Sequence, residues 1–139
     1  AIEISKTDDD TAPDPQHVRV YHNTIYRTNN PDYNENTGIR ISPYARNTSV
    51  FNNLAWFPAD TSALNLLIDQ GTDTSTGGNI LTSAACFADP TNANVLLRSF
   101  ALTIGAEAIN AAESAPVFDD FSGQARNVGT PDIGAMEYR

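Results

Sequence analysis

Apolar and polar positions alternate in short runs along this chain, and a turn-rich segment follows each run. The stretch VRVYHNTIYR, residues 18–27, reads as two short strands joined at His22 and Asn23. The stretch TSVFNNLAWF, residues 48–57, repeats the same pattern. Asn is depleted in strands, so its place in the middle of both runs needs an explanation. Helical spacing is almost absent, and the runs predict short β-strands separated by turns.

The two stretches align residue by residue. Val20 falls on Val50 and Asn23 on Asn53, with an offset of 53 − 23 = 30. The segment GGNIL supplies a third copy, in which Asn79 takes the Asn position at an offset of 79 − 53 = 26. Steps of this size without helices predict a β-solenoid, in which each coil buries its apolar face against the next.

A second repeated run alternates with the first, as AIEIS, TGIRIS and LNLLID. We align Ile4 with Ile41 and Ile41 with Ile68, at offsets of 41 − 4 = 37 and 68 − 41 = 27. The apolar residues two positions earlier are expected to stack in the same way: Ile2, Ile39 and Leu66. Because side chains alternate along a strand, the residues between these positions are expected to point outward: Glu3, Arg40 and Leu67.

This pattern resembles the right-handed parallel β-helix of pectate-lyase-like proteins. The shared features are a strand, then His-Asn or Asn-Asn, a second strand, a loop, and G-I-x-I-S. In that family the Asn sits at a tight bend, where it tolerates left-handed backbone angles and bonds the Asn of the next coil. The resemblance implies an asparagine ladder made by Asn23, Asn53 and Asn79.

The C-terminal part resembles the closing segment of many secreted bacterial β-helix proteins. SGQAR and DIGAMEY match that segment, whereas AEAINAA departs from it at Glu107 and Asn110, where the family has Pro and Asp. The resemblance implies one all-β domain, with about three coils over residues 1–86 and an irregular closing segment over residues 87–139. It also implies a secreted or cell-surface protein, and a chain that is a fragment of, or a subunit in, a longer β-helix.

Charge and cysteine content narrow the partners. The 139 residues carry a formal net charge of −9 with a pI near 4.3, which disfavours nucleic acid and anionic membranes. No run is long and apolar enough to span a bilayer. The single cysteine, Cys86, excludes an internal disulfide and is expected to be a small buried residue.

Outward-facing residues of the strands are candidates for carbohydrate binding. Arg40 can bind a sugar carboxylate, or it can pair with Glu3 on the adjacent coil. Tyr21, Phe51 and Trp56 fall at strand positions in successive coils, and aromatic rings pack on the apolar faces of sugars. The same rings can instead lie under loops or under the C-terminal segment. No general base can be identified beside Arg40, so the catalytic residues stay unknown.

Acidic clusters are the candidates for calcium, the one cofactor that the sequence suggests. Asp8, Asp9 and Asp10 present hard oxygen ligands, although a solvated acidic loop explains them equally simply. Asp119 and Asp120 precede a glycine turn and are expected either to hold calcium or to pair with Arg126.

The two histidines are expected to have structural roles. By alternation with the preceding valines, His22 should point inward as a hydrogen-bonded member of the ladder region. His17 should be a solvated residue at the strand edge.

Two classes of function follow. The first is a non-catalytic extracellular β-helix module that is structural and self-assembling, or that binds carbohydrate. The alternative is the C-terminal part of a polysaccharide lyase or glycoside hydrolase that acts on acidic polysaccharide. The first coil is expected to expose strand edges and isoleucines, which predicts end-to-end stacking with another β-helix chain or with a preceding part of the protein.

Overall fold

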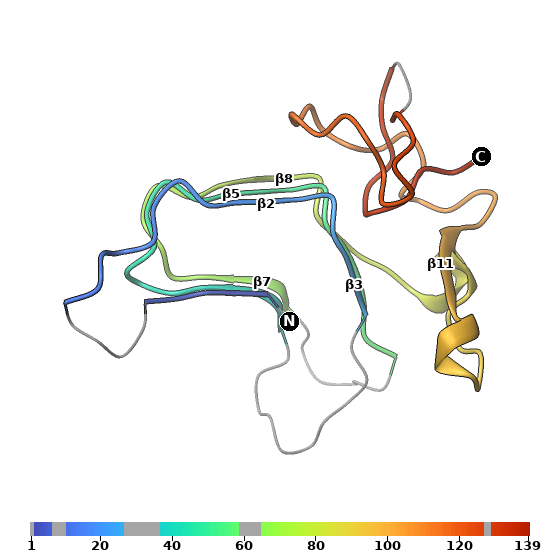
Figure 1. The fold of residues 1–139 in the computed structure, drawn as a ribbon, viewed down its shortest axis with the longest axis horizontal. Helices are drawn as coiled ribbons and strands as arrows, with labels where there is room; N and C mark the ends of the chain where they lie inside the picture. The colour runs from blue at the N-terminus through green and yellow to red at the C-terminus, as the bar shows by residue number, and fades with distance from the viewer. Residues whose placement is uncertain (1, 7–10, 27–36, 59–64, 127–128) are drawn as a thin grey trace.

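The computed structural model describes residues 2–6, 11–26, 37–58, 65–126 and 129–139. Within them, three parallel sheets stack along one axis and form a parallel β-helix of three coils (Figure 1). The first sheet contains β1 (Ile2–Ile4), β4 (Thr37–Ile41) and β7 (Asn65–Asp69). This β-solenoid is the fold class that the repeats predict.

Two further sheets complete each coil. The second contains β2 (Arg19–Tyr21), β5 (Ser49–Phe51) and β8 (Ser75–Gly77). The third contains β3 (Thr24–Tyr26), β6 (Leu54–Trp56) and β9 (Ile80–Leu81). Strands of one sheet overlay each other when the molecule is viewed along the coil axis, as β2, β5 and β8 do in Figure 1.

The register of the first two coils follows the sequence alignment. Ile2 pairs with Ile39 and Ile4 with Ile41. The third coil differs by one residue, because Ile39 pairs with Leu67 rather than with Leu66. The predicted alignment of Ile41 with Ile68 is therefore wrong.

The shifted register also changes which residue of β7 points outward. Ile68 pairs with Arg40, so Ile68 continues the outward column that Glu3 and Arg40 begin. Leu67, which was expected to point outward, packs against the interior cluster. Three successive apolar residues, Leu66, Leu67 and Ile68, leave the inward face of this strand ambiguous in the sequence.

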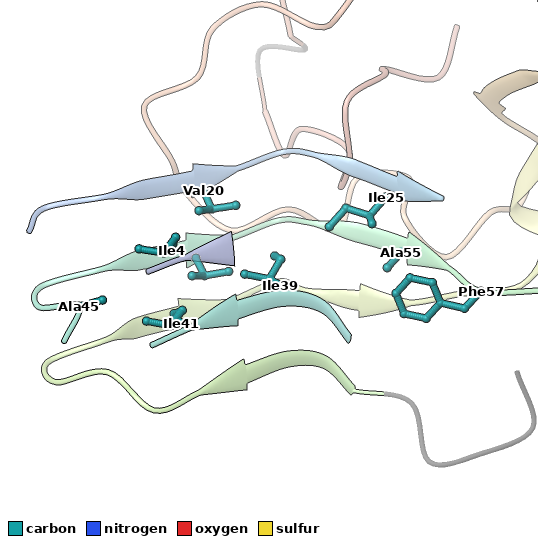
Figure 2. Packing of buried hydrophobic residues seen from close by; sticks show 9 residues of the cluster. Ile4, Val20, Ile25, Ile39, Ile41, Ala45, Ala55 and Phe57 are labelled. Atoms are coloured by element: carbon teal, nitrogen blue, oxygen red, sulfur yellow. The ribbon is translucent and has the colours of Figure 1, made fainter. Parts of the chain in front are cut away.

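The interior of the solenoid is a single apolar cluster (Figure 2). It takes inward residues from strands of the first two coils, such as Val20 from β2, Val50 from β5 and Ile25 from β3. Ile39 and Ile41 of the middle coil are fully buried. Stacking thus removes from water the apolar faces that a lone coil would expose.

An asparagine ladder runs along one bend of the coils. Asn23 Nδ2 donates to Asn53 Oδ1 at 2.9 Å, and Asn53 Nδ2 donates to Asn79 Oδ1 at 2.8 Å. The same two oxygens accept from the backbone N–H of the preceding coil's Asn, at 3.1 Å each. Each amide therefore ties its own bend to the next coil.

The left-handed residue of this bend is the one before each ladder Asn. His22, Asn52 and Gly78 have φ angles of 51°, 59° and 60°. The backbone explanation taken from the family resemblance therefore applies to the preceding residue, and the ladder Asn serves through its side-chain amide. A second bend has the same left-handed conformation at one residue of each coil: His17, Asn47 and Asp73.

The chain then leaves the coils and folds against their side. A short 3₁₀ turn, η1 (Ala84–Cys86), leads into β10 (Phe87–Asp89), which pairs antiparallel with β11 (Ser99–Leu102) across η2 (Val95–Leu97). We call β10, η2 and β11 the hairpin, and residues 103–139 the tail. The hairpin lies beside β3, and the tail lies at the corner where β3 follows β2 (Figure 1).

A second apolar cluster joins these parts to the solenoid. Leu54 and Trp56 on the outer face of β6 pack with Phe87 and Leu102 of the hairpin. Ile133 of the tail is also buried in this cluster. The outer face of the third sheet is therefore covered, whereas its inner face belongs to the first cluster.

Candidate functional site

The four residues predicted to bind carbohydrate do not form one site. Arg40 lies on the outer face of the first sheet, Tyr21 and Phe51 on that of the second, and Trp56 on that of the third. A ligand on one of these faces does not contact the other two, because the three sheets form different sides of the coil (Figure 1).

Tyr21 and Phe51 do contact each other. Their ring centroids are 6.0 Å apart at an interplanar angle of 76°, an edge-to-face pair on adjacent strands. Both residues are half-buried. The column ends at Gly77, because the carboxylate of Glu113 from the tail occupies the space that a side chain there would need.

Trp56 has no ring face for a ligand. It is 6% exposed and is covered by the hairpin, with its ring 6.1 Å from that of Phe87 and 5.2 Å from that of Tyr26. This is a correction to the sequence prediction, and its cause is the antiparallel hairpin that follows the coils. The sequence left two roles open for Trp56, a sugar-binding ring or a ring covered by the C-terminal segment, and the structure has the second.

A pocket of about 520 Å³ opens where the solenoid, the hairpin and the tail meet. We call it the hairpin pocket. Three of its residues belong to the first coil, four to the hairpin edge and three to the tail: Asn23, Thr24, Tyr26, Arg98, Ser99, Phe100, Ala101, Phe121, Ala135 and Met136. The pocket thus combines aromatic rings with a few polar groups.

The aromatic wall of the hairpin pocket is continuous with the second apolar cluster. The rings of Tyr26 and Phe100 are 5.2 Å apart, and Phe100 packs edge-to-face on Phe87 at 5.4 Å. These contacts hold Tyr26 and Phe100 rigidly. Phe121, on the tail side, is 85% exposed, so its ring is available to a bound molecule.

Arg98 is the cation of the hairpin pocket. Its guanidinium lies 5.4 Å from the centre of the Tyr26 ring, and Nη1 donates to the Tyr26 hydroxyl at 3.2 Å. Nε donates to the carbonyl of Asn92 at 3.0 Å, which anchors the side chain to the hairpin loop. Asn94 caps η2 by accepting from the N–H of Leu96, so the loop is itself ordered by local hydrogen bonds.

His22 lies beneath the tail, not inside the solenoid. Its Nδ1 is 3.2 Å from the carbonyl oxygen of Asp132, and Asn52 Nδ2 is 3.1 Å from its Nε2. The left-handed backbone of His22 breaks the strand alternation, which is why the predicted inward direction is wrong. The hydrogen-bonded role is nevertheless present, with one partner in the tail, Asp132, and one in the second coil, Asn52. His17 is exposed.

The hydrogen bonds of Asn52 define the protonation of His22. Asn52 Oδ1 accepts from the Glu113 N–H and Nδ2 donates to the Glu113 carbonyl, each at 2.8 Å, so the orientation of the amide is fixed. Nδ2 can then only donate to His22 Nε2, which must be unprotonated. Burial first, and the positive charge of Arg126 second, lower the pKa of His22 from 6.5 to about 4.

The tail motif SGQAR…DIGAMEY forms a buried ionic network. Arg126 Nη1 bonds Glu137 Oε1 at 2.7 Å, and Arg126 Nη2 donates to the carbonyl of Gly134 at 2.9 Å. Asp132 accepts from the N–H groups of Asn110 and Tyr138 at 2.7 and 2.5 Å. The polar residues of this motif therefore fold the tail on itself.

Backbone bonds then attach the folded tail to the first two coils. The N–H of Gly134 donates to the carbonyl of Asn52 at 2.9 Å, and the N–H of Ala135 donates to Thr24 Oγ1 at 3.0 Å. This attachment places Ala135 and Met136 in the wall of the hairpin pocket.

Asp120 does not pair with Arg126, contrary to one of the two sequence expectations. Its Oδ1 accepts from the hydroxyl and N–H of Ser122 at 2.6 and 2.9 Å, and its Oδ2 faces Arg139 at 3.4 Å. Burial opposes ionisation of Asp120, but these hydrogen bonds and one from the N–H of Gln124 outweigh it and hold its pKa below the usual range. Arg126 pairs with Glu137 instead, eleven positions later.

The acidic residues were candidates for metal binding in the sequence, and the cysteine was expected to be buried. In it, no group of three or more His, Cys, Asp or Glu side chains is arranged to hold a metal ion. Asp8, Asp9 and Asp10 lie outside the described residues. Cys86 is buried, and burial raises the pKa of its thiol. No helix of the described residues has the length and apolar character to cross a membrane.

The sequence reasoning missed the hairpin pocket because its residues lie outside the repeats. Arg98, Phe100 and Phe121 belong to no periodic column, and they meet Tyr26 only through long-range packing. One signal was available: FALT and FDDF place aromatic residues in a segment that the repeat pattern does not use.

Comparison with protein-family models gives no match, and no curated protein matches this chain.

Proposed function

We propose that this chain is a non-catalytic extracellular β-helix module that binds carbohydrate in the hairpin pocket. The observation that carries the proposal is a pocket of about 520 Å³ that combines an exposed aromatic ring, two fixed rings and an arginine. Small-molecule sites usually measure about 300–1,000 Å³ and join an apolar lining to a few polar groups.

The chemistry of the pocket suits a sugar. A pyranose ring has an apolar face of C–H groups, which can pack on the ring of Phe121. Its hydroxyls need donors and acceptors, and Arg98, Asn23 and Ser99 supply them on the opposite walls. Because Arg98 is the cation at this site, the pocket tolerates an acidic sugar despite the chain's net charge of −9.

The non-catalytic part of the proposal is supported by how the buried titratable groups are used. Glu137 binds Arg126, Asp132 binds backbone N–H groups of the tail, and Asp120 caps a turn. His22 is enclosed between Asn52 and Asp132. A general acid or base must reach a substrate, and these groups serve the fold instead. The extracellular location is supported by the resemblance of the tail to secreted proteins.

A binding screen with matched variants tests the proposal. The chain would be titrated calorimetrically with a panel of neutral and acidic oligosaccharides. For the best ligand, Phe121→Ala should weaken binding about 10-fold, since an aromatic platform contributes on the order of 1 kcal/mol. Arg98→Gln should weaken the binding of an acidic oligosaccharide more than that of a neutral one.

Phe118→Ala is the matched control, because Phe118 is 79% exposed in the same tail but does not line the pocket. It should leave the affinity unchanged. Equal losses for Phe118→Ala and Phe121→Ala, or no binding to any oligosaccharide in the panel, would contradict the proposal.

A further inference from the structure

The two ends of the solenoid differ in how their interior positions are covered. In the first coil the inward residues Ile4, Val20 and Ile25 are 6–7% exposed. The residues paired to the same columns in the third coil are exposed: Asp69, Thr76 and Leu81. The sequence had predicted an open first coil with exposed isoleucines. The structure instead buries Ile4 and leaves the interior positions of the third coil accessible.

Strand β7 forms the longest open edge at this exposed end. It spans five residues and is the last strand of its sheet, next to β4. Its sequence NLLID contains three successive aliphatic residues, Leu66, Leu67 and Ile68, all half-buried. Natural edge strands are usually protected by lysine, proline or a bulge, and NLLID contains neither lysine nor proline.

We propose that the exposed end is a dimerisation surface, in which β7 pairs antiparallel with β7 of a second copy of this chain. A two-fold axis through Leu67 places Leu66 opposite Ile68 of the second copy and Leu67 opposite its own equivalent. The same axis places Asn65 opposite Asp69. The three-stranded sheet of each copy becomes half of one continuous six-stranded sheet.

The polar ends of β7 suit this pairing. Asp69 Oδ1 accepts from the N–H of Gly71 at 2.9 Å and from the hydroxyl of Thr74 at 3.1 Å. Both of these bonds use the same oxygen, so Oδ2 can accept from the Asn65 amide of the second copy. Cross-strand pairs of this kind stabilise antiparallel sheets. The strand is thus complementary to itself in one register.

The difference between the two ends favours a two-fold contact over head-to-tail stacking. Head-to-tail stacking would require the interior of the first coil to be accessible, and Ile4, Val20 and Ile25 are already buried. Head-to-tail contacts also continue without limit, whereas a two-fold contact closes after two copies. The proposal is independent of the hairpin pocket, which lies against the first coil.

Sedimentation velocity over a range of concentrations tests the oligomer. The wild-type chain should form a species of twice the 15.0 kDa chain mass and none larger. Ile68→Glu should weaken the dimer roughly 10-fold, because it removes the aliphatic cross-strand contact with Leu66 at both symmetric positions of the dimer. The substitution should not harm the monomer, since residue 68 points outward beside Arg40. Circular dichroism would verify that the variant folds.

Leu96→Glu is the matched control, because Leu96 is 88% exposed on the hairpin and far from β7 in sequence. It adds the same charge and removes a comparable aliphatic side chain, and it should leave the dimer intact. A wild-type monomer at all concentrations, species that grow beyond the dimer, or equal weakening by Leu96→Glu would overturn the proposal.

Disulfide trapping tests the register. When Asn65→Cys and Asp69→Cys chains are mixed, oxidation should link the two variants to each other, because the proposed pairing places these positions opposite. Neither variant alone should form a linked dimer efficiently. Efficient linkage of Asn65→Cys to itself would contradict the antiparallel register.

Discussion

The coils and the tail of this protein are stabilised in different ways. Each coil repeats the same interactions as its neighbour: parallel strand pairs, an inward apolar column and a ladder asparagine. The tail has no such repeat and depends on single contacts, above all the buried Arg126–Glu137 pair and the bonds from Asn52 to Glu113. A substitution in the coils should therefore remove one of several equivalent contacts, whereas one in the tail should remove a contact that nothing else supplies.

The largest effect is expected at the buried ion pair of the tail. The side chains of Arg126 and Glu137 are 4% and 1% exposed. Glu137→Ala leaves the guanidinium of Arg126 buried without its carboxylate, which costs about 3–5 kcal/mol of the free energy of unfolding. Urea denaturation would measure the loss. Glu107→Ala, at an exposed position of the same tail, should change stability by less than about 0.5 kcal/mol. A loss below about 1 kcal/mol for Glu137→Ala would contradict this view of the tail.

The next largest effect is a pH dependence of stability, caused by His22, which contacts both the coils and the tail. The pKa of His22 is about 4 in the folded chain and 6.5 in the reference state, so the unfolded chain binds more protons between these values. Stability is therefore lost as pH falls from about 6.5 to 4, by roughly 3 kcal/mol, as protonated Nε2 then opposes the amide of Asn52.

Carboxylates titrate in the same range, so the wild type should be compared with His22→Asn. Asn tolerates the left-handed backbone at this position but carries no titratable group. The difference between the two unfolding free energies should shrink as pH falls. A wild type and variant with parallel pH profiles would show that His22 does not couple the tail to the coils.

The smallest effect is expected in the repeated region, and the ladder offers an internal comparison. Asn53 bonds the coils on both of its sides and is fully buried. Asn53→Ala should cost about 1–3 kcal/mol by orphaning these groups. Among the described residues Asn23 bonds the coil on one side alone, through Asn53, and donates besides to the carbonyl of Tyr21, so Asn23→Ala should cost less. Equal losses of stability for the two variants, or a loss under roughly 0.5 kcal/mol for Asn53→Ala, would contradict the view that each ladder bond stabilises the stacked coils.

The same contrast explains what could be predicted from the sequence. Strands that repeat the same sequence pattern are expected to pair at matching positions. The pairing of Val20 with Val50 and of Ile4 with Ile41 could therefore be predicted from alignment alone. The register of the third coil could not be predicted, because Leu66 and Leu67 are adjacent leucines that fit either face. Both pack against the interior cluster, and the pairing of Leu67 with Ile39 distinguishes them.

The candidate site was largely beyond sequence reasoning. Arg126 lies six positions after Asp120, yet its carboxylate partner is Glu137, because the tail turns back on itself. Trp56 lies at an outward strand position, yet the hairpin covers it. Tyr26 was visible in the repeats as an aromatic residue, but nothing local shows that Arg98 approaches its ring. Contacts between a repeat and a non-repeating segment leave no periodic signal.

The hairpin pocket lies where the two regions meet, so it depends on both. NMR chemical-shift mapping with the best oligosaccharide of the binding screen tests this most directly. We predict that the amides of Asn23, Ser99, Phe121 and Met136 shift together on titration, while those of Arg40 and Phe51 on the open sheet faces do not. Shifts centred on the faces of Arg40 or of Tyr21 and Phe51, with the pocket amides unchanged, would contradict the proposed site.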